Sequence, residues 1–128
     1  MPLSNYSKIG TINFWVRNQA VDQPGQCFVA LYSTNPSGAD TGTEVSGGGY
    51  ARQPVTFGNP TISGEQAISQ NTAVVNFPQL TASAGTAAFI ALKDAQSGGN
   101  LIALSASLQL NAGFQPFIPI GDLRVIAT

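Results

Sequence analysis

The 128-residue chain contains no histidine and only one cysteine. Histidine is the commonest general base and metal ligand, so a Ser-His-Asp or Cys-His catalytic arrangement is impossible and a zinc site is close to excluded. One cysteine cannot form a disulfide within the chain, and Cys27 lies in an apolar run where we expect it to be a small buried hydrophobic residue. We therefore expect a protein that is not an enzyme, with no catalytic residue, no metal site and no cofactor.

Charge is scarce as well. Asp, Glu, Lys and Arg make up 9% of the residues, with five basic and six acidic side chains and a net charge of -1. An average soluble domain has about 25% charged residues. The basic residues are scattered singly, so the chain lacks the basic patch that binding of nucleic acid requires, and we expect no nucleic-acid partner. A surface this neutral favours either coverage in an assembly, because interface cores are depleted in charge, or a neutral polar exterior.

Long apolar segments are also missing. No stretch approaches the ~20 apolar residues that span a bilayer, and residues 1–10 lack the apolar core of a signal peptide. We expect a protein that has no membrane partner and is made in a cytoplasm. The length of 128 residues fits a single domain, residues 1–128.

Short apolar runs separated by turn residues are what the sequence does contain. They predict about seven to eight strands between residues 27 and 127, which include 27–32, 50–57, 62–69, 72–77, 85–92 and 101–110. Gly, Pro and Asn separate these runs, for example in the predicted loop of hairpin length at 93–100 and in the predicted turn at 111–113. The pattern is typical of a mostly β fold, an antiparallel β-sandwich or small barrel over residues 27–127.

Residues 1–20 are predicted to form an N-terminal segment with a short helix. Ser4 or Asn5 fits the helix N-cap position. Four apolar residues share one face of this helix: Tyr6, Ile9, Ile12 and Val16. Gly10 and Thr11 are poor helix formers, however, and the alternation of apolar residues over 12–16 would also fit a strand.

A long polar loop, residues 33–49, follows the first strand and is too long for a simple hairpin. Asp40 and Glu44 are close in this loop, so they could bind a hard cation, or Asp40 could bond its own backbone. Tyr50 and Arg52 then share one face of the next strand. The Arg52 guanidinium could fork a carboxylate of the loop, or one of a neighbouring subunit.

The stretch VALYSTNPSGADTGTEVSGGGYARQPVTFG, residues 29–58, resembles the signature of a group of small virion proteins of tailed bacteriophages. The resemblance continues in NFP at 76–78, in LKDAQSGGNLIALSASL at 92–108 and in the closing NAGFQPFIPIGDLRVIA. It covers the chain from about residue 3 to residue 127. Members of the group are labelled either head decoration (cement) proteins or tail-fibre-like proteins, and the resemblance favours the helix over the strand in the N-terminal segment.

The resemblance implies a structural protein on the capsid exterior of a phage virion, made in the host cytoplasm. As a homo-oligomer, most simply a trimer, it would bind the major capsid protein and staple neighbouring capsid subunits together. The alternative is a tail-fibre or tail-tip component that recognises a host receptor, with Tyr32, Tyr50 and Trp15 exposed in one groove. Because long loops often carry interaction surfaces, we expect partner contacts in residues 36–50 and 2–17. The side chains singled out for partner binding are Asn35, Asp40, Glu44, Tyr50, Arg52 and Trp15.

Overall fold

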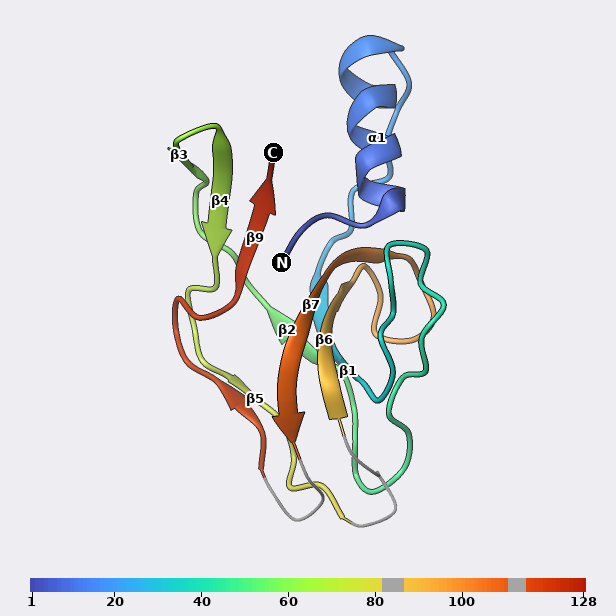
Figure 1. Cartoon of the computed structure of the whole chain (residues 1–128), viewed down its shortest axis with the longest axis vertical. Coiled ribbons are helices and arrows are strands. Elements are labelled where there is room, and N and C mark those ends of the chain that lie inside the picture. The colour runs from blue at the N-terminus through green and yellow to red at the C-terminus, as the bar shows by residue number, and fades with distance from the viewer. Residues whose placement is uncertain (82–86, 111–114) are drawn as a thin grey trace.

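The computed structural model describes residues 1–81, 87–110 and 115–128. The predicted turn at 111–113 and the start of the run at 85–92 lie outside the described residues. The described residues form one helix and nine strands, in the order α1 (Asn5–Val16), β1 (Cys27–Tyr32), β2 (Gln53–Val55), β3 (Thr61–Ser63), β4 (Gln66–Gln70), β5 (Val75–Asn76), β6 (Ala87–Lys93), β7 (Leu101–Leu110), β8 (Phe117–Ile118) and β9 (Arg124–Ala127) (Figure 1). The prediction of a mostly β chain with a short N-terminal helix is confirmed.

The strands form three antiparallel sheets, with the orders β2-β1-β6-β7, β3-β4-β9 and β5-β8. Single-residue bridges connect neighbouring sheets: Pro2 pairs with Ile126 of β9, and Leu3 pairs with Ala103 of β7. The N-terminal residues therefore lie between two sheets and tie them together. Of the two predicted architectures, the described residues do not form a closed barrel, because their sheets stay separate apart from such bridges.

Two predicted strands differ from the observed ones for local reasons. The run 62–69 was expected as one strand, but β3 and β4 form a hairpin because Gly64, with a φ of 61°, allows the chain to reverse. The predicted strand 50–57 is reduced to β2, because the next backbone groups at this edge of β1, those of Leu31, bond the Val45 amide and the Tyr50 hydroxyl instead. Strands β6 and β7 form the predicted hairpin, although its connection begins one residue later than the predicted 93–100, because Lys93 still belongs to β6.

Strand β1 is buried on both faces, which explains its almost continuous apolar sequence. Val29 and Leu31 point into the main core, where they pack with residues of β2, β5, β6 and β8. Ala30 and Tyr32 point the other way and pack with Ala91 of β6 in a smaller cluster. The loop at 33–49 meets this second face through Asp40, which bonds Tyr32 and Lys93. Cys27, at the start of β1, is half-buried and not fully buried as expected.

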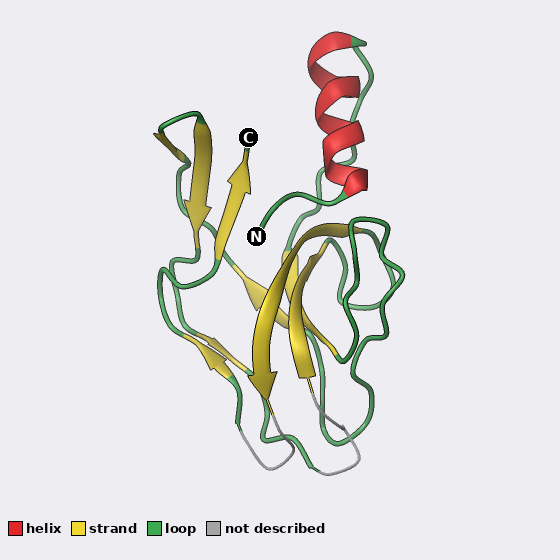
Figure 2. Ribbon diagram, in the orientation of Figure 1, coloured by secondary structure: helices red, strands yellow, loops and turns green. Residues whose placement is uncertain are grey.

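Helix α1 begins with the predicted N-cap, because the Ser4 hydroxyl accepts a hydrogen bond of 3.2 Å from the Ser7 amide. The Ser4 hydroxyl also donates to the Leu101 carbonyl, and its amide donates to the Ile102 carbonyl at 2.8 Å. The helix ends just before Asn18, which has a left-handed φ of 55°. Its base is therefore fixed to β7, while the rest of the helix stands apart from the strands (Figure 2). Among the described residues, no helix has the length and apolar character needed to cross a bilayer.

Candidate functional site

The loop at 33–49 folds back onto β1 and replaces a missing strand partner. Strand β2 pairs with β1 only as far as Val29, so the backbone groups of Leu31 need other partners. The Leu31 carbonyl accepts from the Val45 amide at 2.9 Å, and the Leu31 amide donates to the Tyr50 hydroxyl at 3.0 Å. Val45 is 5% exposed and belongs to the main core. The loop is thus ordered by contacts within the chain.

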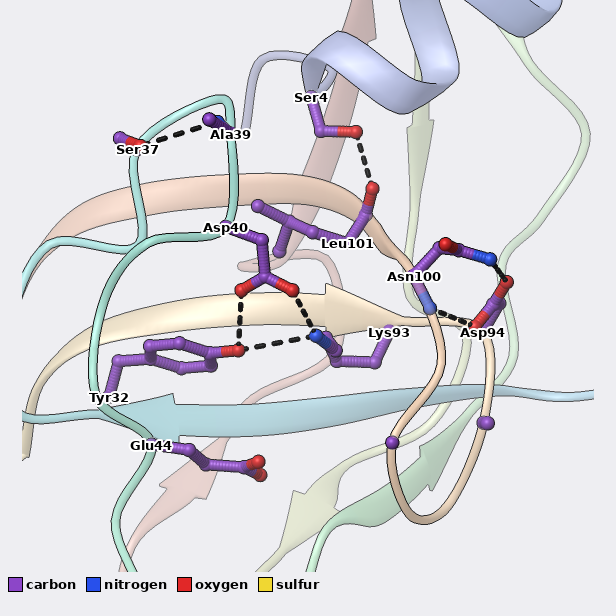
Figure 3. Close-up of polar contacts among 12 residues, drawn as sticks. Ser4, Tyr32, Ser37, Ala39, Asp40, Glu44, Lys93, Asp94, Asn100 and Leu101 are labelled. Atoms are coloured by element: carbon purple, nitrogen blue, oxygen red, sulfur yellow. Dashed lines mark hydrogen bonds and ion pairs between the residues drawn. The ribbon is translucent and has the colours of Figure 1, made fainter.

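The first polar cluster joins the loop to β1 and β6 through Asp40 (Figure 3). The Lys93 ammonium donates to Asp40 Oδ2 at 2.5 Å, and the Tyr32 hydroxyl donates to Asp40 Oδ1 at 2.9 Å. Lys93 is only 3% exposed, so it needs this carboxylate as a partner. Burial raises the pKa of the Tyr32 hydroxyl, and its hydrogen bond to Asp40 raises that pKa further. Asp40 therefore fastens the loop to the sheet.

The second cluster lies further along the loop and centres on Glu44. Arg52 donates from Nε to Oε2 and from Nη2 to Oε1 of this carboxylate, both at 2.7 Å, and Tyr50 donates to Oε2 at 2.7 Å. The remaining nitrogen, Nη1, donates to the carbonyls of Ala95 and Gly98 in the β6–β7 connection, both at 2.7 Å. The predicted fork of Arg52 with a carboxylate of the loop is confirmed. Arg52 links the loop, β2 and the β6–β7 connection.

Electrostatics in the second cluster favour the ion pair. Burial alone would raise the pKa of Glu44, but hydrogen bonds from Arg52 and Tyr50 and the charge of Arg52 lower it below its usual value. Burial and the hydrogen bond to Glu44 raise the pKa of Tyr50. Glu44 is therefore held as a carboxylate and Tyr50 as a neutral phenol. Both side chains hold the loop in place, because their hydrogen bonds go to partners within the chain.

The structure separates the two carboxylates that the sequence placed together. Asp40 bonds Tyr32 and Lys93 and not its own backbone, while Glu44 bonds Arg52, so the two acids neutralise different cations. Within residues 1–81, 87–110 and 115–128, no three His, Cys, Asp or Glu side chains gather as a potential metal site.

The role of Lys93 as the partner of Asp40 was not predicted from the sequence. Residues two positions apart in a strand share a face, so Lys93 lies on the same face as the buried Ala91. This alternation was the available signal that Lys93 is a buried partner.

The other residues singled out for partner binding lie apart from these clusters. Asn35 is exposed, and its side-chain oxygen accepts from the Ser37 amide at 2.9 Å. The expected groove of three exposed aromatic residues is wrong. Tyr32 is 3% exposed, Tyr50 stacks on Phe77 with ring centroids 6.3 Å apart, and Trp15 lies on α1.

Helix α1 carries a large exposed apolar surface, to which we refer as the α1 patch. None of the helix residues is buried. The patch consists of Tyr6 (40% exposed), Ile9 (62%), Ile12 (57%), Phe14 (49%), Trp15 (77%) and Val16 (74%). The returning chain covers only part of one side, where Val21 packs near Gly10. A patch of this kind on a monomer is typical of an interaction site.

Two rigid polar clusters and an apolar helix are thus the notable features of the described chain. The family model of the podophage GP4 fiber I protein gp80 matches residues 2–126. No curated protein matches the chain in the comparison. The family match spans nearly the whole sequence and agrees with the phage virion motifs at 29–58 and 92–108. The protein therefore belongs to the family of the podophage GP4 fiber I protein gp80, a family of structural fibre proteins of bacteriophages.

Proposed function

We propose that this protein is a non-enzymatic structural subunit of the virion that assembles through the α1 patch, with the strands serving as a rigid body. The observation that carries the proposal is the exposure of α1. Six large apolar side chains of this helix are between 40% and 77% exposed, whereas many comparable residues elsewhere in the described chain are buried in two core clusters.

The stability of α1 supports a docking role. The helix has 12 residues, and isolated helices shorter than about 12–15 residues are marginal in water. Gly10 in its middle lowers the stability further, by about 1 kcal/mol relative to alanine. The contacts of α1 with the body are concentrated at its base, around Ser4, Ser7 and Ile102. Packing against a partner would supply the stabilisation that this helix lacks.

The two polar clusters support a structural role for the body. A loop of this length is commonly mobile, but Asp40 and Glu44 each fasten it to a buried cation. Removal of either partner would leave a buried charge unpaired, which typically costs about 3–5 kcal/mol. The loop surface, with Asn35 exposed at its start, is thereby presented in one conformation and provides a second region for partner contacts.

We propose a fibre as the location on the particle, following the description of the family. The alternative is the capsid exterior, where the protein would act as a decoration protein and bind the major capsid protein as a homotrimer. The scarcity of charge, 9% of residues, agrees with coverage by partners at either location.

Particles that lack the protein provide the test. Purified wild type, Trp15→Gln and the control Phe117→Gln would be added back, and bound protein would be quantified. Phe117 is 61% exposed, and its strand β8 pairs with β5 at a distance from α1, so the control removes a comparable apolar side chain (Figure 1). We expect Trp15→Gln to bind the particles at least tenfold more weakly than Phe117→Gln does. Both variants should keep the melting temperature of wild type. Equal occupancy of all three proteins would contradict docking through α1, and gold labelling of bound wild type would distinguish fibre from capsid.

A further inference from the structure

We propose that the Lys93 amine and the Asp40 carboxyl group condense into an isopeptide bond, which ties the loop at 33–49 covalently to strand β6. The inference concerns the loop and the strands, so it does not depend on what binds α1. It follows from the contact between the two side chains, from the hydroxyl group that lies beside both of them, and from the rigid backbone that carries them. The reaction takes place once within the chain and has no turnover, so it agrees with the non-enzymatic role proposed above.

The two reacting groups are in direct contact. Lys93 Nζ lies 2.5 Å from Asp40 Oδ2. Because a carbon–oxygen bond measures about 1.2 Å, Nζ is at most about 3.7 Å from the Cγ atom that it would attack. Reactants in a near-attack arrangement lie about 3–3.5 Å apart, and such proximity can equal an effective concentration of about 10⁵ M or more. A small movement of the lysine side chain therefore brings its nitrogen to the carboxyl carbon.

The Tyr32 hydroxyl lies beside both reacting groups (Figure 3). It donates to Asp40 Oδ1 at 2.9 Å and accepts from Lys93 Nζ at 3.3 Å. Burial raises the pKa of this hydroxyl, and its hydrogen bond to Asp40 raises that pKa further, so the hydroxyl keeps its proton at neutral pH. A fixed neutral donor next to Oδ1 stabilises the negative charge that develops on this oxygen during attack at Cγ. Tyr32 therefore has the position of a catalytic residue for the condensation.

The ion pair contains every atom that the condensation needs. A proton passes from the Lys93 ammonium to Asp40 Oδ2, and the free amine attacks Cγ. The new bond joins Nζ to Cγ, and negative charge collects on Oδ1, to which Tyr32 donates. A second proton passes from Nζ to Oδ2, the bond between Cγ and Oδ2 breaks, and water leaves. One ammonium and one carboxylate thus become one amide and one water molecule, without an oxidant, a reductant or another reactant.

The backbone holds both side chains in place. Lys93 ends β6, a strand that pairs with β1 on one side and with β7 on the other. Asp40 has a left-handed φ of 58°, a conformation in which Asp is more frequent than most residues. The Thr41 amide donates to the Pro36 carbonyl at 2.7 Å and closes the turn that contains Asp40. The carboxylate is therefore presented to the amine from a fixed turn, and the amine comes from a strand that is paired on both sides.

Burial favours the amide over the ion pair. Lys93 is buried, and an ion pair taken out of water loses hydration that the attraction between its charges does not always offset. A neutral amide avoids this loss. The Asp40 side chain is 29% exposed and borders a cleft of about 430 Å³, so the released water has a path to solvent. The neighbouring pair of Arg52 and Glu44 cannot react in this way, because a guanidinium stays protonated and offers no free amine.

The bond would supply a cross-link that the chain cannot form with sulfur, because a single cysteine excludes an internal disulfide. It would close the segment between residues 40 and 93. Like a disulfide, it would restrict the unfolded chain, and this effect grows with the length of the closed segment. Unlike a disulfide, it would resist reducing agents. The loop and the central strands would then form one covalently closed body.

Intact mass spectrometry of the purified full chain, at once and after several days at neutral pH, tests the inference. We expect the wild-type mass to be lower than that of the unmodified sequence by one water molecule. Tandem spectra of a protease digest should show the peptide with residue 40 joined to the peptide with residue 93. Lys93→Arg keeps a cation beside Asp40 but offers no amine, so its mass should be unmodified. Lys8→Arg, at an exposed lysine of α1, is the matched control and should lose water as wild type does.

Tyr32→Phe tests the part of the hydroxyl in the reaction. It should keep the wild-type circular dichroism spectrum and form the cross-link at least tenfold more slowly. A wild-type chain that keeps its full mass after several days would overturn the inference. Loss of water without joined peptides, or an equal loss in Lys93→Arg, would overturn it as well, because a cyclic imide at an aspartate would explain the mass. A cross-link that forms in Tyr32→Phe at the wild-type rate would support the bond and overturn the catalytic role of Tyr32.

Discussion

Arg52 and Glu44 form a two-point ion pair, in which Nε and Nη2 of the guanidinium each lie 2.7 Å from a different carboxylate oxygen. The pair joins two residues eight positions apart in the sequence. Through its third nitrogen, Arg52 also holds the β6–β7 connection. One side chain therefore determines how two loops sit against the sheet, and its geometry can be tested separately from its charge.

Replacement of Arg52 should reveal this geometry. Arg52→Ala leaves Glu44 partly buried without its cation, and we expect the free energy of unfolding to fall by about 3 kcal/mol. Arg52→Lys keeps the charge but loses the planar fork and the bonds to both carbonyls, so we expect a loss of about 1–2 kcal/mol. Urea unfolding measures both values. Arg17→Ala, on the exposed end of α1, is the control, and its free energy of unfolding should stay within about 0.5 kcal/mol of wild type. Equal stability of wild type and both Arg52 variants would refute the role of the fork.

Acid should weaken the same cluster. The pKa of Glu44 is lower in the folded protein than in the unfolded chain, where it is about 4.3. The contribution of Glu44 to stability is therefore fully present above about pH 5 and is lost as the pH falls through the folded pKa. We expect the free energy of unfolding of wild type to decrease from pH 5 toward pH 3, and the decrease to be smaller in Glu44→Gln. Chemical denaturation at a series of pH values measures this difference, and identical profiles would argue against it.

The loop at 33–49 should be intolerant of a side chain at Gly42. A Cβ atom there would lie 2.7 Å from the backbone of Asn35 and Pro36, which the fold cannot move cheaply. We expect Gly42→Ala to lower the free energy of unfolding by about 1–3 kcal/mol through overpacking. Gly25→Ala is the control, because a Cβ atom at Gly25 has no neighbour within 4 Å. Equal effects of the two substitutions on the melting temperature would show that the loop does not pack as described.

The thiol of Cys27 should react slowly in the native protein. Burial raises its pKa, and the negative charge of Asp94 raises it further, so the reactive thiolate is rare at neutral pH. Because the residue is half-buried, we expect slow labelling and not complete protection. A water-soluble thiol reagent at pH 7 should label the native protein at least tenfold more slowly than the urea-unfolded protein. Equal rates would mean that the start of β1 is open to solvent.

Local sequence patterns were sufficient for several elements. The N-cap at Ser4, the dense apolar run of β1 and the hairpin of β6 and β7 were predicted correctly, because short-range hydrogen bonding and hydrophobic patterning decide them. The fork of Arg52 was predicted as well, since a carboxylate lay within reach in the adjoining loop. Motifs within the chain also indicated the phage virion family, which the family match confirmed.

The sequence by itself therefore determined a mostly β chain with an N-terminal helix, a polar loop tied to the following strand, and a phage origin. Only the tertiary structure decided that Lys93 is the partner of Asp40, 53 positions away, because that pairing depends on how β6 lies beside β1. It also decided that residues 1–3 join β7 to β9 and that the apolar face of α1 remains uncovered. An apolar helical face has the same sequence pattern whether it is buried or exposed, and only the position of the other elements shows which surface still needs a partner.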